Sequence, residues 1–434
     1  MLRGHGERPS WRNHALFPLY CAFPIWSFQG EFYGNAMGNA VALIASSAAV
    51  AVFGGRIVVG GARRDWGAFS AIAACLCLSL GCYQSFLFLF LAAGMGAIVA
   101  QSRRQASFEL GQVIRPLTFM AQVTCAALLL NQAIYSLHLF ALHLHPENLH
   151  YNSRIHLLWQ QPSAALRQVF DFILKVYGGD ALIYGISLRG AALLFGLAAT
   201  GLVAYLLQRQ QRLRGLALLG LAAGILLVPF ALNFVVVGPM PARTLAAIPY
   251  VVWLAAWLAT SQASHTGRAV ACGCVAYLSF QCFYANSLYQ ADMSLTQSSD
   301  RALAAAIYER MSLTHPNFDA EKFYEVNFFG SLASRYSLYP TGFGSTAGAS
   351  FFNWDDGNPN RIGSYLRLTG HKITLADYAR RAELLADMRA MPHWPAQGSV
   401  RWKGDVALVK VGPRPDIAHR RDMETSGGHL YAQP

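Results

Sequence analysis

Glu31 is the first side chain whose type and position could serve catalysis. It stands near Tyr33 and Asn35, just before the first full-length apolar stretch of the chain. A carboxylate beside a membrane cavity suits a general base that deprotonates an acceptor hydroxyl. We therefore take Glu31 as the candidate catalytic residue and Asn35 as a candidate lining residue. The ordinary alternative for Glu31 is an acid in a solvated loop.

Arg243 is the second candidate, and its neighbours make its position rigid. It follows the turn Gly238-Pro239-Met240-Pro241 between two long apolar stretches. A guanidinium at the edge of a membrane can hold a phosphate through two parallel hydrogen bonds. We expect Arg243 to bind a donor phosphate. The alternative is a cation that extends towards lipid headgroups.

Tyr83 and Gln84 form the third polar position. They interrupt a run without any charged residue, Ala68–Ala100. One helix of that length would reach about 50 Å, much longer than a bilayer core needs. We predict a break near Gly81 that gives two short helices and places Tyr83 and Gln84 in a cavity. The alternative is a simple turn anchored by Tyr83 at the interface.

Other chemistry finds little support in the sequence. Four histidines surround Glu147 and could ligate a metal, but their segment has the pattern of an interfacial helix: His143, His145, His150 and His156. We predict no metal site, although a divalent metal cofactor is left open. All eight cysteines lie in or beside apolar segments, which argues against a disulfide framework. No glycine-rich phosphate loop and no serine-hydrolase elbow is present.

The elements that must position these residues are membrane helices. The chain is 54% hydrophobic and only 13% charged, whereas soluble domains average roughly 25% charged residues. We predict a polytopic α-helical membrane protein with about eight transmembrane helices, at residues 37–53, 67–82, 84–100, 116–139, 189–207, 214–237, 244–262 and 269–286. The segment 140–188 has the aromatic residues of an interfacial region.

The distribution of arginines predicts the orientation. Placing the arginine-bearing loops in the cytoplasm satisfies the positive-inside rule at every turn: Arg56, Arg63 and Arg64; Arg103, Arg104 and Arg115; Arg209, Arg212 and Arg214; Arg268. Glu31, Gln84, Arg243 and everything after residue 286 then lie outside. The net charge of +12 comes almost wholly from residues 1–286, so it indicates membrane topology and not a nucleic-acid partner.

Three regions follow from this pattern. Residues 1–36 form an N-terminal segment that we interpret as truncated. Residues 37–286 form the transmembrane domain, and residues 287–434 a small soluble extracytoplasmic α/β domain with a flexible end after about residue 412. In that domain we predict helices at 299–311 and 375–388, the second capped by Thr374. Strands are predicted at 322–329 and, as a pair, within 399–411.

Two motifs in the soluble domain carry a family resemblance. Gly348-Ala-Ser-Phe-Phe-Asn-Trp-Asp-Asp-Gly357 and Met391-Pro-His-Trp-Pro-Ala-Gln-Gly-Ser-Val400 resemble the serotype-converting O-antigen glucosyltransferases of the Gtr II type. The Tyr83-Gln84 break and the Arg243 turn are also similar to that family. The resemblance implies additional N-terminal spans with an acidic external loop in most relatives, and we expect this chain to begin after that portion.

The resemblance implies a membrane glycosyltransferase of the GT-C architecture in the bacterial inner membrane. It would transfer a hexose, glucose by analogy, from a polyprenyl-phosphate carrier to a cell-surface glycan such as O-antigen. Its partners would be the bilayer, the lipid-linked donor and the glycan acceptor. Trp354, Asp355 and Asp356 are then candidate acceptor contacts, the alternative being a turn beside a buried tryptophan. Two rival functions are a lipid-linked sugar transporter or flippase, and an inactive truncated homologue.

Overall fold

The computed structural model describes residues 11–31, 33–61, 65–105, 109–143, 157–208, 212–261, 264–333 and 349–413. The chain forms two compact units, which we describe separately. The helical unit contains residues up to Ser287, and the C-terminal unit begins at Leu288. One helix, α14 (His265–Thr314), runs through this boundary without a break.

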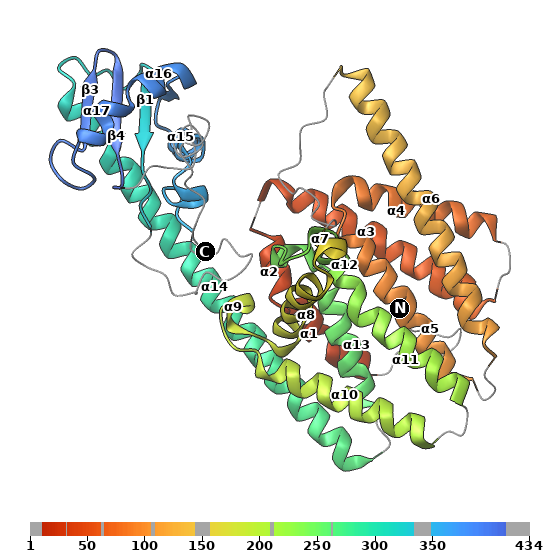
Figure 1. Ribbon diagram of the computed structural model, residues 1–434. Coiled ribbons are helices and arrows are strands. Elements are labelled where there is room, and N and C mark those ends of the chain that lie inside the picture. Colours follow the sequence, from red (N-terminus) through yellow and green to blue (C-terminus); the bar gives the residue numbers. More distant parts are fainter. Residues whose placement is uncertain are drawn as a thin grey trace. The chain divides into compact units, whose positions relative to one another are not determined.

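The helical unit is built almost entirely from α-helices (Figure 1). The helices that precede residue 143 are α1 (Trp11–Ala22), α2 (Ile25–Gln29), α3 (Ala36–Val52), α4 (Trp66–Cys82), α5 (Phe86–Arg104) and α6 (Gly111–Ala141), and α3 continues as a π-helix, η2 (Phe53–Val59). The later ones are α7 (Leu157–Gln160), α8 (Pro162–Gly178), α9 (Ala181–Tyr184), α10 (Arg189–Gln208), α11 (Arg212–Leu227), α12 (Ala231–Val236) and α13 (Ile248–Thr260). Short 3₁₀ turns are η1 (Tyr33–Asn35), η3 (Val228–Phe230) and η4 (Ala242–Thr244).

The predicted interruption of the uncharged run is confirmed. α4 ends at Cys82 and α5 begins at Phe86. Tyr83 between them has an extended backbone with φ −159° and ψ 109°, which no helix continues. Two shorter helices therefore replace one that would be too long, and the second of them, α5, is long and apolar enough to cross a membrane.

The count of eight spans is not confirmed. Each predicted span coincides with a helix, but five helical stretches among the described residues are long and apolar enough to cross a membrane: Ala36–Val59, Phe86–Arg103, Gly111–Ala141, Leu213–Val236 and His265–Thr314. Trp66–Cys82 and Ile248–Thr260 are apolar but shorter. The last stretch is much longer than the predicted segment 269–286, because the predicted helix 299–311 continues it.

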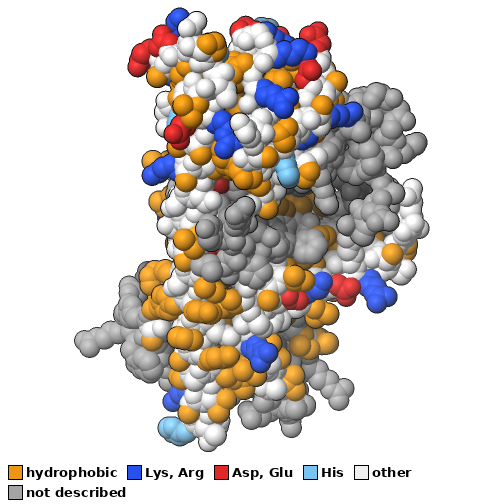
Figure 2. Space-filling model, turned by 90° about the vertical axis from the view of Figure 1, so that its left-hand side faces the viewer, with side chains coloured by type: hydrophobic (Ala, Val, Ile, Leu, Met, Phe, Trp, Pro, Cys, Tyr) orange, Lys and Arg blue, Asp and Glu red, His pale blue; other side chains and the backbone are white. Residues whose placement is uncertain are grey.

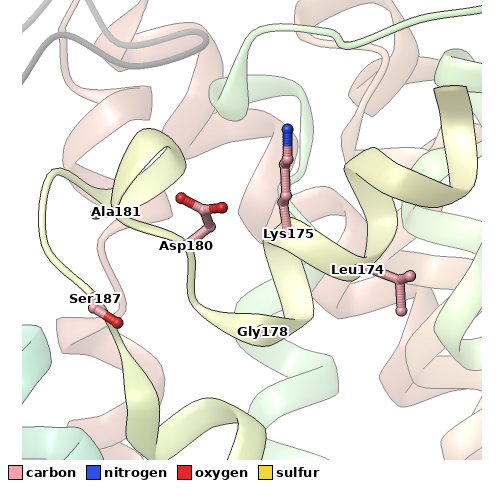
Figure 3. Close-up of a pocket in the computed structure, with 6 residues that line it drawn as sticks. All are labelled: Leu174, Lys175, Gly178, Asp180, Ala181 and Ser187. Atoms are coloured by element: carbon pink, nitrogen blue, oxygen red, sulfur yellow. The ribbon is translucent and has the colours of Figure 1, made fainter.

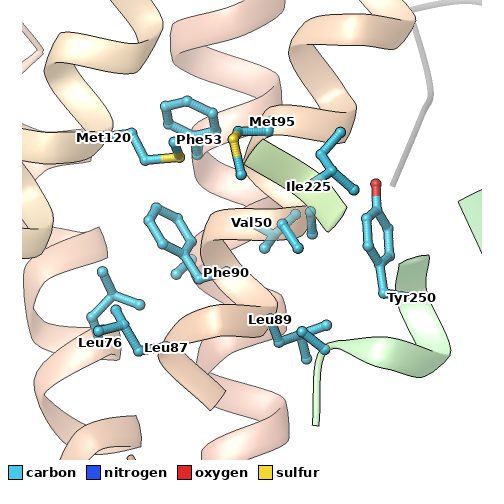
Figure 4. Close-up of a cluster of buried hydrophobic side chains, with 14 of the residues drawn as sticks. Val50, Phe53, Leu76, Leu87, Leu89, Phe90, Met95, Met120, Ile225 and Tyr250 are labelled. Atoms are coloured by element: carbon cyan, nitrogen blue, oxygen red, sulfur yellow. The ribbon is translucent and has the colours of Figure 1, made fainter. Parts of the chain in front are cut away.

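Aromatic and sulfur-containing side chains fill the core of the helical unit. Figure 4 shows Phe53 from η2 lying between Met95 of α5 and Met120 of α6. A Cβ atom on Gly94 would lie 2.9 Å from the Met120 sulfur, so this close packing requires glycine. Small residues at helix contacts are typical of membrane proteins, where close backbone approach replaces the hydrophobic driving force.

The C-terminal unit contains one mixed sheet with the strand order β2-β1-β4-β3. Its strands are β1 (Tyr324–Phe329), β2 (Ile373–Leu375), β3 (Val400–Lys403) and β4 (Val406–Lys410), and its helices are α15 (Pro359–Leu368), α16 (Tyr378–Glu383) and α17 (Leu385–Ala390) together with the end of α14. β1 pairs in parallel with β2 and β4, while β3 and β4 form an antiparallel hairpin. The predicted strand at 322–329 and the predicted strand pair within 399–411 are thus present.

The predicted helix 375–388 is wrong in its start and its continuity. Thr374 lies inside β2 and caps nothing. Asp377 caps α16 instead, since its carboxylate accepts a hydrogen bond of 2.8 Å from the Arg380 N–H. A second helix, α17, starts after Leu384. Parallel pairing of β2 with β1 gives Ile373–Leu375 more backbone hydrogen bonds than a helical first turn would.

The two units differ in their surfaces. Figure 2 shows acidic and basic side chains concentrated over the C-terminal unit and large hydrophobic areas over the helical unit. Many large apolar side chains of the helical unit are exposed, among them Leu129 at 72% and Phe140 at 79%. Such continuous apolar surface fits helices that face lipid.

Candidate functional site

The short helix α2 is the point where the polar positions of the helical unit meet. Pro24 precedes it and fixes the backbone for a helical start, and Gly30 ends it. Side chains of α2 contact the start of α3, the α4–α5 break, η4 and α14. We call α2 and these contact residues the α2 hub: Trp26, Ser27, Gln29, Asn39, Phe86, Arg243 and Asn286.

Gln29 joins α2 to the turn that carries Arg243. Its side-chain N–H donates to the Arg243 carbonyl oxygen. The backbone carbonyl oxygen of Gln29 accepts a 3.0 Å hydrogen bond from Asn39 Nδ2. The amide oxygens of Gln29 and Asn39 are buried and have no hydrogen-bond partner among the described residues. Buried acceptors without a donor are unfavourable by about 1–3 kcal/mol each, so this place favours a ligand that brings hydroxyl donors.

Glu31 is buried, and a solvated loop acid is therefore the wrong interpretation. It is 7% exposed and lies two residues after Gln29. Its backbone N–H donates weakly to the Phe28 carbonyl at 3.4 Å. Because Glu31 follows Gln29 by two residues, it lies next to the segment that contacts the Arg243 turn. A carboxylate in such a place is held by its surroundings for a purpose beyond solubility.

Aromatic contacts connect α2 to the Tyr83 break. The Trp26 ring stacks on Phe86 with a centroid distance of 6.4 Å. Phe86 in turn meets Tyr83 edge to face at 6.0 Å. Tyr83 is half-buried, whereas Gln84 is exposed. Tyr83 thus belongs to the wall beside the α2 hub, and Gln84 lies at its outer surface.

Asn35 lies farther from these contacts than expected. It occupies the N-cap position of α3 but makes no capping hydrogen bond, and its side chain is exposed. Asn39, one helical turn later, faces α2 instead. Residues four apart share a helix face, so the helical period alone does not separate the two; Asn35 lies at the N-cap, before the first helical residue of α3, whereas Asn39 lies one turn inside the helix.

The turn that holds Arg243 has an unusual backbone. Val237 adopts a left-handed conformation with φ 53°, which a β-branched residue rarely tolerates. Asn233 supports it by donating a 2.9 Å hydrogen bond from its buried Nδ2 to the Gly238 carbonyl. Thr244 closes the turn through a 2.8 Å hydrogen bond to Pro241. Strain of this kind persists where the surroundings enforce it, and it is common at functional sites.

The candidate acceptor contacts lie in the C-terminal unit. The Arg361 guanidinium covers the Trp354 ring at 4.2 Å and forms an ion pair with Asp355. Phe351 lies 5.7 Å from the same ring. Asp355 has a left-handed backbone with φ 50°. The Trp354 ring is half-buried, and the side chain of Asp356 lies outside the described residues.

A buried carboxylate fixes the segment before Trp354. Asp300 of α14 is 2% exposed and accepts hydrogen bonds from the Ser350 hydroxyl and, at 2.7 Å, from the Phe351 N–H. The neighbouring helix α15 is capped by Asn358, whose side chain accepts from Asn360 at 2.9 Å. These local bonds account for the Asn353–Asn358 turn, in which Trp354 and Arg361 are half-exposed and Asp355 is exposed.

Within the described part of the chain, no group of three or more metal-ligating side chains comes together. His145, His150, His156 and Glu147 lie outside the described residues, so the histidine-rich segment is not decided by this observation. His143 ends the described part of that loop with a left-handed backbone, φ 51°.

Six of the seven hub residues escaped the sequence analysis: Trp26, Ser27, Gln29, Asn39, Phe86 and Asn286. Gln29 could have been noticed, because an amide inside a mostly apolar stretch next to Glu31 is costly unless it has a use. Trp26 and Asn39 carry no such signal. Their partners are distant in sequence, and only the folded chain brings them together.

The fold and the site together define a multi-helix membrane protein with a small α/β unit and a buried polar hub at the ends of several helices. The family model described as glucosyl transferase GtrII matches residues 1–260, which is more than half of the chain, and the chain belongs to this family. The matched part contains Glu31, the Tyr83 break and Arg243, while both motifs of the C-terminal unit lie beyond it. No curated protein and no solved structure matches the chain.

Membership of this family makes the chain a glycosyltransferase. The family also implies a role in glycan modification of the O-antigen kind. A membrane protein is consistent with the apolar helices of the structure.

Proposed function

We propose that the protein transfers a hexose, glucose in the first instance, from a polyprenyl-phosphate carrier to a cell-surface glycan such as O-antigen. The α2 hub would be the place of transfer, on the outer side of the bacterial inner membrane. The C-terminal unit would lie on the same side and contact the glycan acceptor. The family match supports the reaction class, and the geometry of the hub supports the location.

The observation that carries the proposal is the contact between α2 and the Arg243 turn. Gln29 bonds to the Arg243 carbonyl, and Glu31 follows two residues later in a buried position. This contact joins segments more than 200 residues apart and supports the proposal that Glu31, Arg243 and the amide oxygens of Gln29 and Asn39 serve one site. A sugar phosphate on a lipid needs these three kinds of group.

Each residue then has a chemical task. Glu31 accepts the proton from the acceptor hydroxyl, whose oxygen forms the new bond to the anomeric carbon of the hexose. The bond from that carbon to the phosphate oxygen breaks, and the polyprenyl phosphate leaves with the electron pair. Arg243 stabilises the charge that develops on the departing phosphate. The reaction inverts the anomeric configuration, since one displacement occurs.

The amide oxygens of Gln29 and Asn39 would accept hydrogen bonds from hexose hydroxyls. The phosphodiester of the donor is ionised at neutral pH and offers hydrogen-bond acceptors only, so it could not satisfy them. Tyr83 would wall the site and Gln84 and Asn35 would lie at its rim. Trp354 and Asp355 of the C-terminal unit would contact the acceptor through the exposed part of the Arg361–Trp354 pair.

The test is transfer by the purified full chain in detergent or nanodiscs, with polyprenyl-phosphate glucose and a glycan acceptor. We expect Arg243→Ala and Glu31→Gln each to lower kcat by about 10²–10³-fold, in the range of lost phosphate clamps and lost general bases. Arg243→Lys should recover part of the activity, because it keeps the charge and loses the bidentate geometry.

Arg301→Ala serves as the matched control, since Arg301 is an exposed arginine of the C-terminal unit. Its activity should equal that of the unmodified chain. Unchanged transfer by Arg243→Ala would remove Arg243 from the site. Movement of the lipid-linked sugar across the bilayer without transfer would instead establish the transporter alternative.

A further inference from the structure

Helix α8 has three distinct sides, although it is too short to span a bilayer. Its 17 residues would reach about 26 Å at ~1.5 Å per residue. One side is buried against the helical unit: Ala165, Val169, Phe172, Ile173 and Val176. A second side carries exposed apolar residues at four-residue spacing, namely Leu166 at 39%, Phe170 at 44% and Leu174 at 69% exposure. The third side is polar and exposed: Arg167, Gln168, Asp171 and Lys175.

This division fits a helix that lies in a membrane interface. With about 100° between successive residues, the exposed apolar side falls between the buried side and the polar side. Such a helix turns one side to protein, one to acyl chains and one to water. Trp159, which is 84% exposed and stands just before α8, adds an aromatic residue of the kind found at interfaces.

The position of α8 agrees with that orientation. Tyr177 donates a 2.7 Å hydrogen bond to the Leu226 carbonyl near the end of α11, and its ring meets Phe195 in the first half of α10 at 4.8 Å. α8 therefore crosses the bundle near the end of α11 and the beginning of α10. Figure 1 looks nearly along the axis of α8, whereas α10 and α11 run across the picture.

An open hollow lies at the C-terminal end of α8. It has a volume of about 490 Å³ and is lined by Leu174, Lys175, Gly178, Asp180, Ala181 and Ser187. Figure 3 shows the Lys175 and Asp180 side chains extending on the same side of the hollow, with Leu174 directed elsewhere. Neither charged group forms an ion pair with another residue in the described ranges.

The backbone beneath this hollow is fixed. Gly179 has a left-handed conformation with φ 69°, and a Cβ there would lie 2.3 Å from the Leu188 carbonyl oxygen. Gln281 of α14 holds the other wall, because it accepts from the Gly190 N–H at 2.9 Å and donates to the Ser187 carbonyl at 3.0 Å. A hollow formed in advance binds its ligand without a further ordering cost.

We propose that α8 lies in the plane of one membrane interface and that the hollow binds the headgroup of a phosphoethanolamine lipid. Lys175 provides a cation for the phosphate. Asp180 would repel a headgroup with negative charge alone, but it can accept hydrogen bonds from a primary ammonium. One Asp180 oxygen accepts from the Leu182 N–H at 2.8 Å and caps α9, which leaves the other oxygen for the ligand. Exposed Leu174 and Leu182 stand beside the hollow to meet the acyl chains.

The helices that carry this site also contact segments beside the α2 hub, although the site does not depend on the transfer reaction. Gln168 on the polar side of α8 lies against Gly238, whose Cβ position is 3.5 Å from the glutamine nitrogen. Phe23, just before α2, meets Tyr184 of α9 edge to face at 5.7 Å. A lipid held by α8 and α9 would therefore border the segments that carry Glu31 and Arg243.

The first experiment measures depth in the bilayer. In the full chain in nanodiscs, Leu174 and Asp171 are replaced one at a time by a fluorescent unnatural amino acid, and quenching by lipids brominated on their acyl chains is recorded. We expect quenching roughly threefold stronger at position 174 than at 171, because the two residues belong to the apolar and polar sides. Equal quenching at both positions would overturn the interfacial placement.

The second experiment counts lipids bound to the delipidated full chain by native mass spectrometry. Phosphatidylethanolamine, phosphatidylglycerol and phosphatidylcholine are titrated separately, with inorganic phosphate as a competitor. We expect phosphatidylethanolamine to bind most tightly. Lys175→Gln and Asp180→Asn should each weaken it by roughly fivefold, which corresponds to ~1 kcal/mol for one charge at a headgroup.

The choice of variants separates binding from folding. Asn caps helices as well as Asp does, so Asp180→Asn keeps α9 and removes the charge alone. Lys322→Gln, at an exposed lysine of the C-terminal unit, should leave all three affinities unchanged. Equal binding of phosphatidylglycerol, or displacement of the lipid by inorganic phosphate, would overturn the assignment to a phosphoethanolamine headgroup. Both experiments report lipid contact, so a failed transfer assay would not affect them.

Discussion

The helical unit and the C-terminal unit differ in how often their cations meet carboxylates: among the described residues, one ion pair lies in the helical unit and five lie in the C-terminal unit. In the helical unit, charged and amide groups bond to backbone carbonyls, as Arg214 does with Ser102 and Gln105 and as Gln29 does with Arg243. In the C-terminal unit, cations meet carboxylates: Arg380 with Glu325 and Asp405, Lys372 with Glu321, Lys403 with Asp387, and Arg361 with Asp355.

The composition explains this difference. The helical part of the chain has few acids to offer its arginines, so carbonyls at helix ends serve as their partners. The C-terminal part has nearly equal numbers of both charges. Buried polar contacts in the first unit therefore define its architecture and its site, while exposed ion pairs in the second contribute little to stability. Four changes test this contrast.

The largest loss of stability is expected at the carboxyl ends of β1 and β4. Here close packing, and not an ion pair, stabilises the C-terminal unit. A Cβ on Gly412 would lie 2.0 Å from the Ser331 carbonyl oxygen. Gly412→Ala should destabilise the C-terminal unit by about 3 kcal/mol, at the upper end of overpacking effects. Hydrogen exchange should rise in β1 and β4 and stay unchanged in α3 to α6.

Gly404→Ala is the control for this first change. Gly404 has φ 61° but no neighbour within 4 Å of its Cβ position, so it isolates the conformational cost of about 1 kcal/mol. Equal losses of stability in the two variants would show that the backbone near Gly412 moves and relieves the clash.

Arg214→Leu should be the most damaging loss of a charge. Arg214 is 1% exposed and donates to the last turn of α5 through Ser102 and to Gln105 beyond it. Its removal strips donors from carbonyls at a helix end, for an expected loss of about 2 kcal/mol. Thermal unfolding of the purified chain measures it. Arg115→Leu, at an exposed arginine of α6, also removes one positive charge and should change the midpoint temperature of unfolding little.

The pH dependence of the C-terminal unit should show a smaller effect. Burial lowers the pKa of His371 below its ordinary value of 6.5, and the ring stacks on Tyr308 at 4.5 Å. The unfolded chain then takes up the proton first, so stability falls as the pH drops from about 6.5 through the lowered pKa. His371→Phe keeps the stack and should flatten this part of the profile. If the stability of this variant still falls by the same amount with decreasing pH, the pH dependence belongs to another group.

Arg380→Met should have the smallest effect. Its guanidinium is half-exposed and bonds Glu325 at 2.7 Å as well as Asp405. Solvent and salt screen such pairs, so the unfolding midpoint should move little at low ionic strength and not at all at high salt. A loss comparable to that of Arg214→Leu would remove the contrast between the two units.

The sequence allowed much of the architecture to be predicted. The apolar runs located eight of the helices but neither α8 nor the full length of α14. The length limit of a membrane helix required the break that Tyr83 makes. Alternation and a Lys-Gly-Asp turn predicted the β3–β4 hairpin. These features depend on local periodicity and on length, which a sequence displays directly.

Other features needed partners distant along the chain. Thr374 was expected to cap a helix, but pairing of β2 with β1 placed it in a strand. Glu31 and Arg243 were recognised by residue type, yet nothing local indicated that Gln29 would bond the Arg243 carbonyl or that Asn39, and not Asn35, would face α2. Side-chain register and contacts across more than 200 residues depend on how helices pack.

The sequence by itself thus determined the class of protein: membrane helices whose apolar runs are interrupted by polar residues, followed by a small α/β region. Bilayer length and hydrophobic periodicity leave few alternatives to this interpretation. Only the tertiary structure decided that α2 is the point where those interruptions meet. It also decided that α8 has a buried side, an exposed apolar side and an exposed polar side. The physical reason is that a buried polar group must find its partner in three dimensions, and the identity of that partner is set by packing and not by neighbours in the chain.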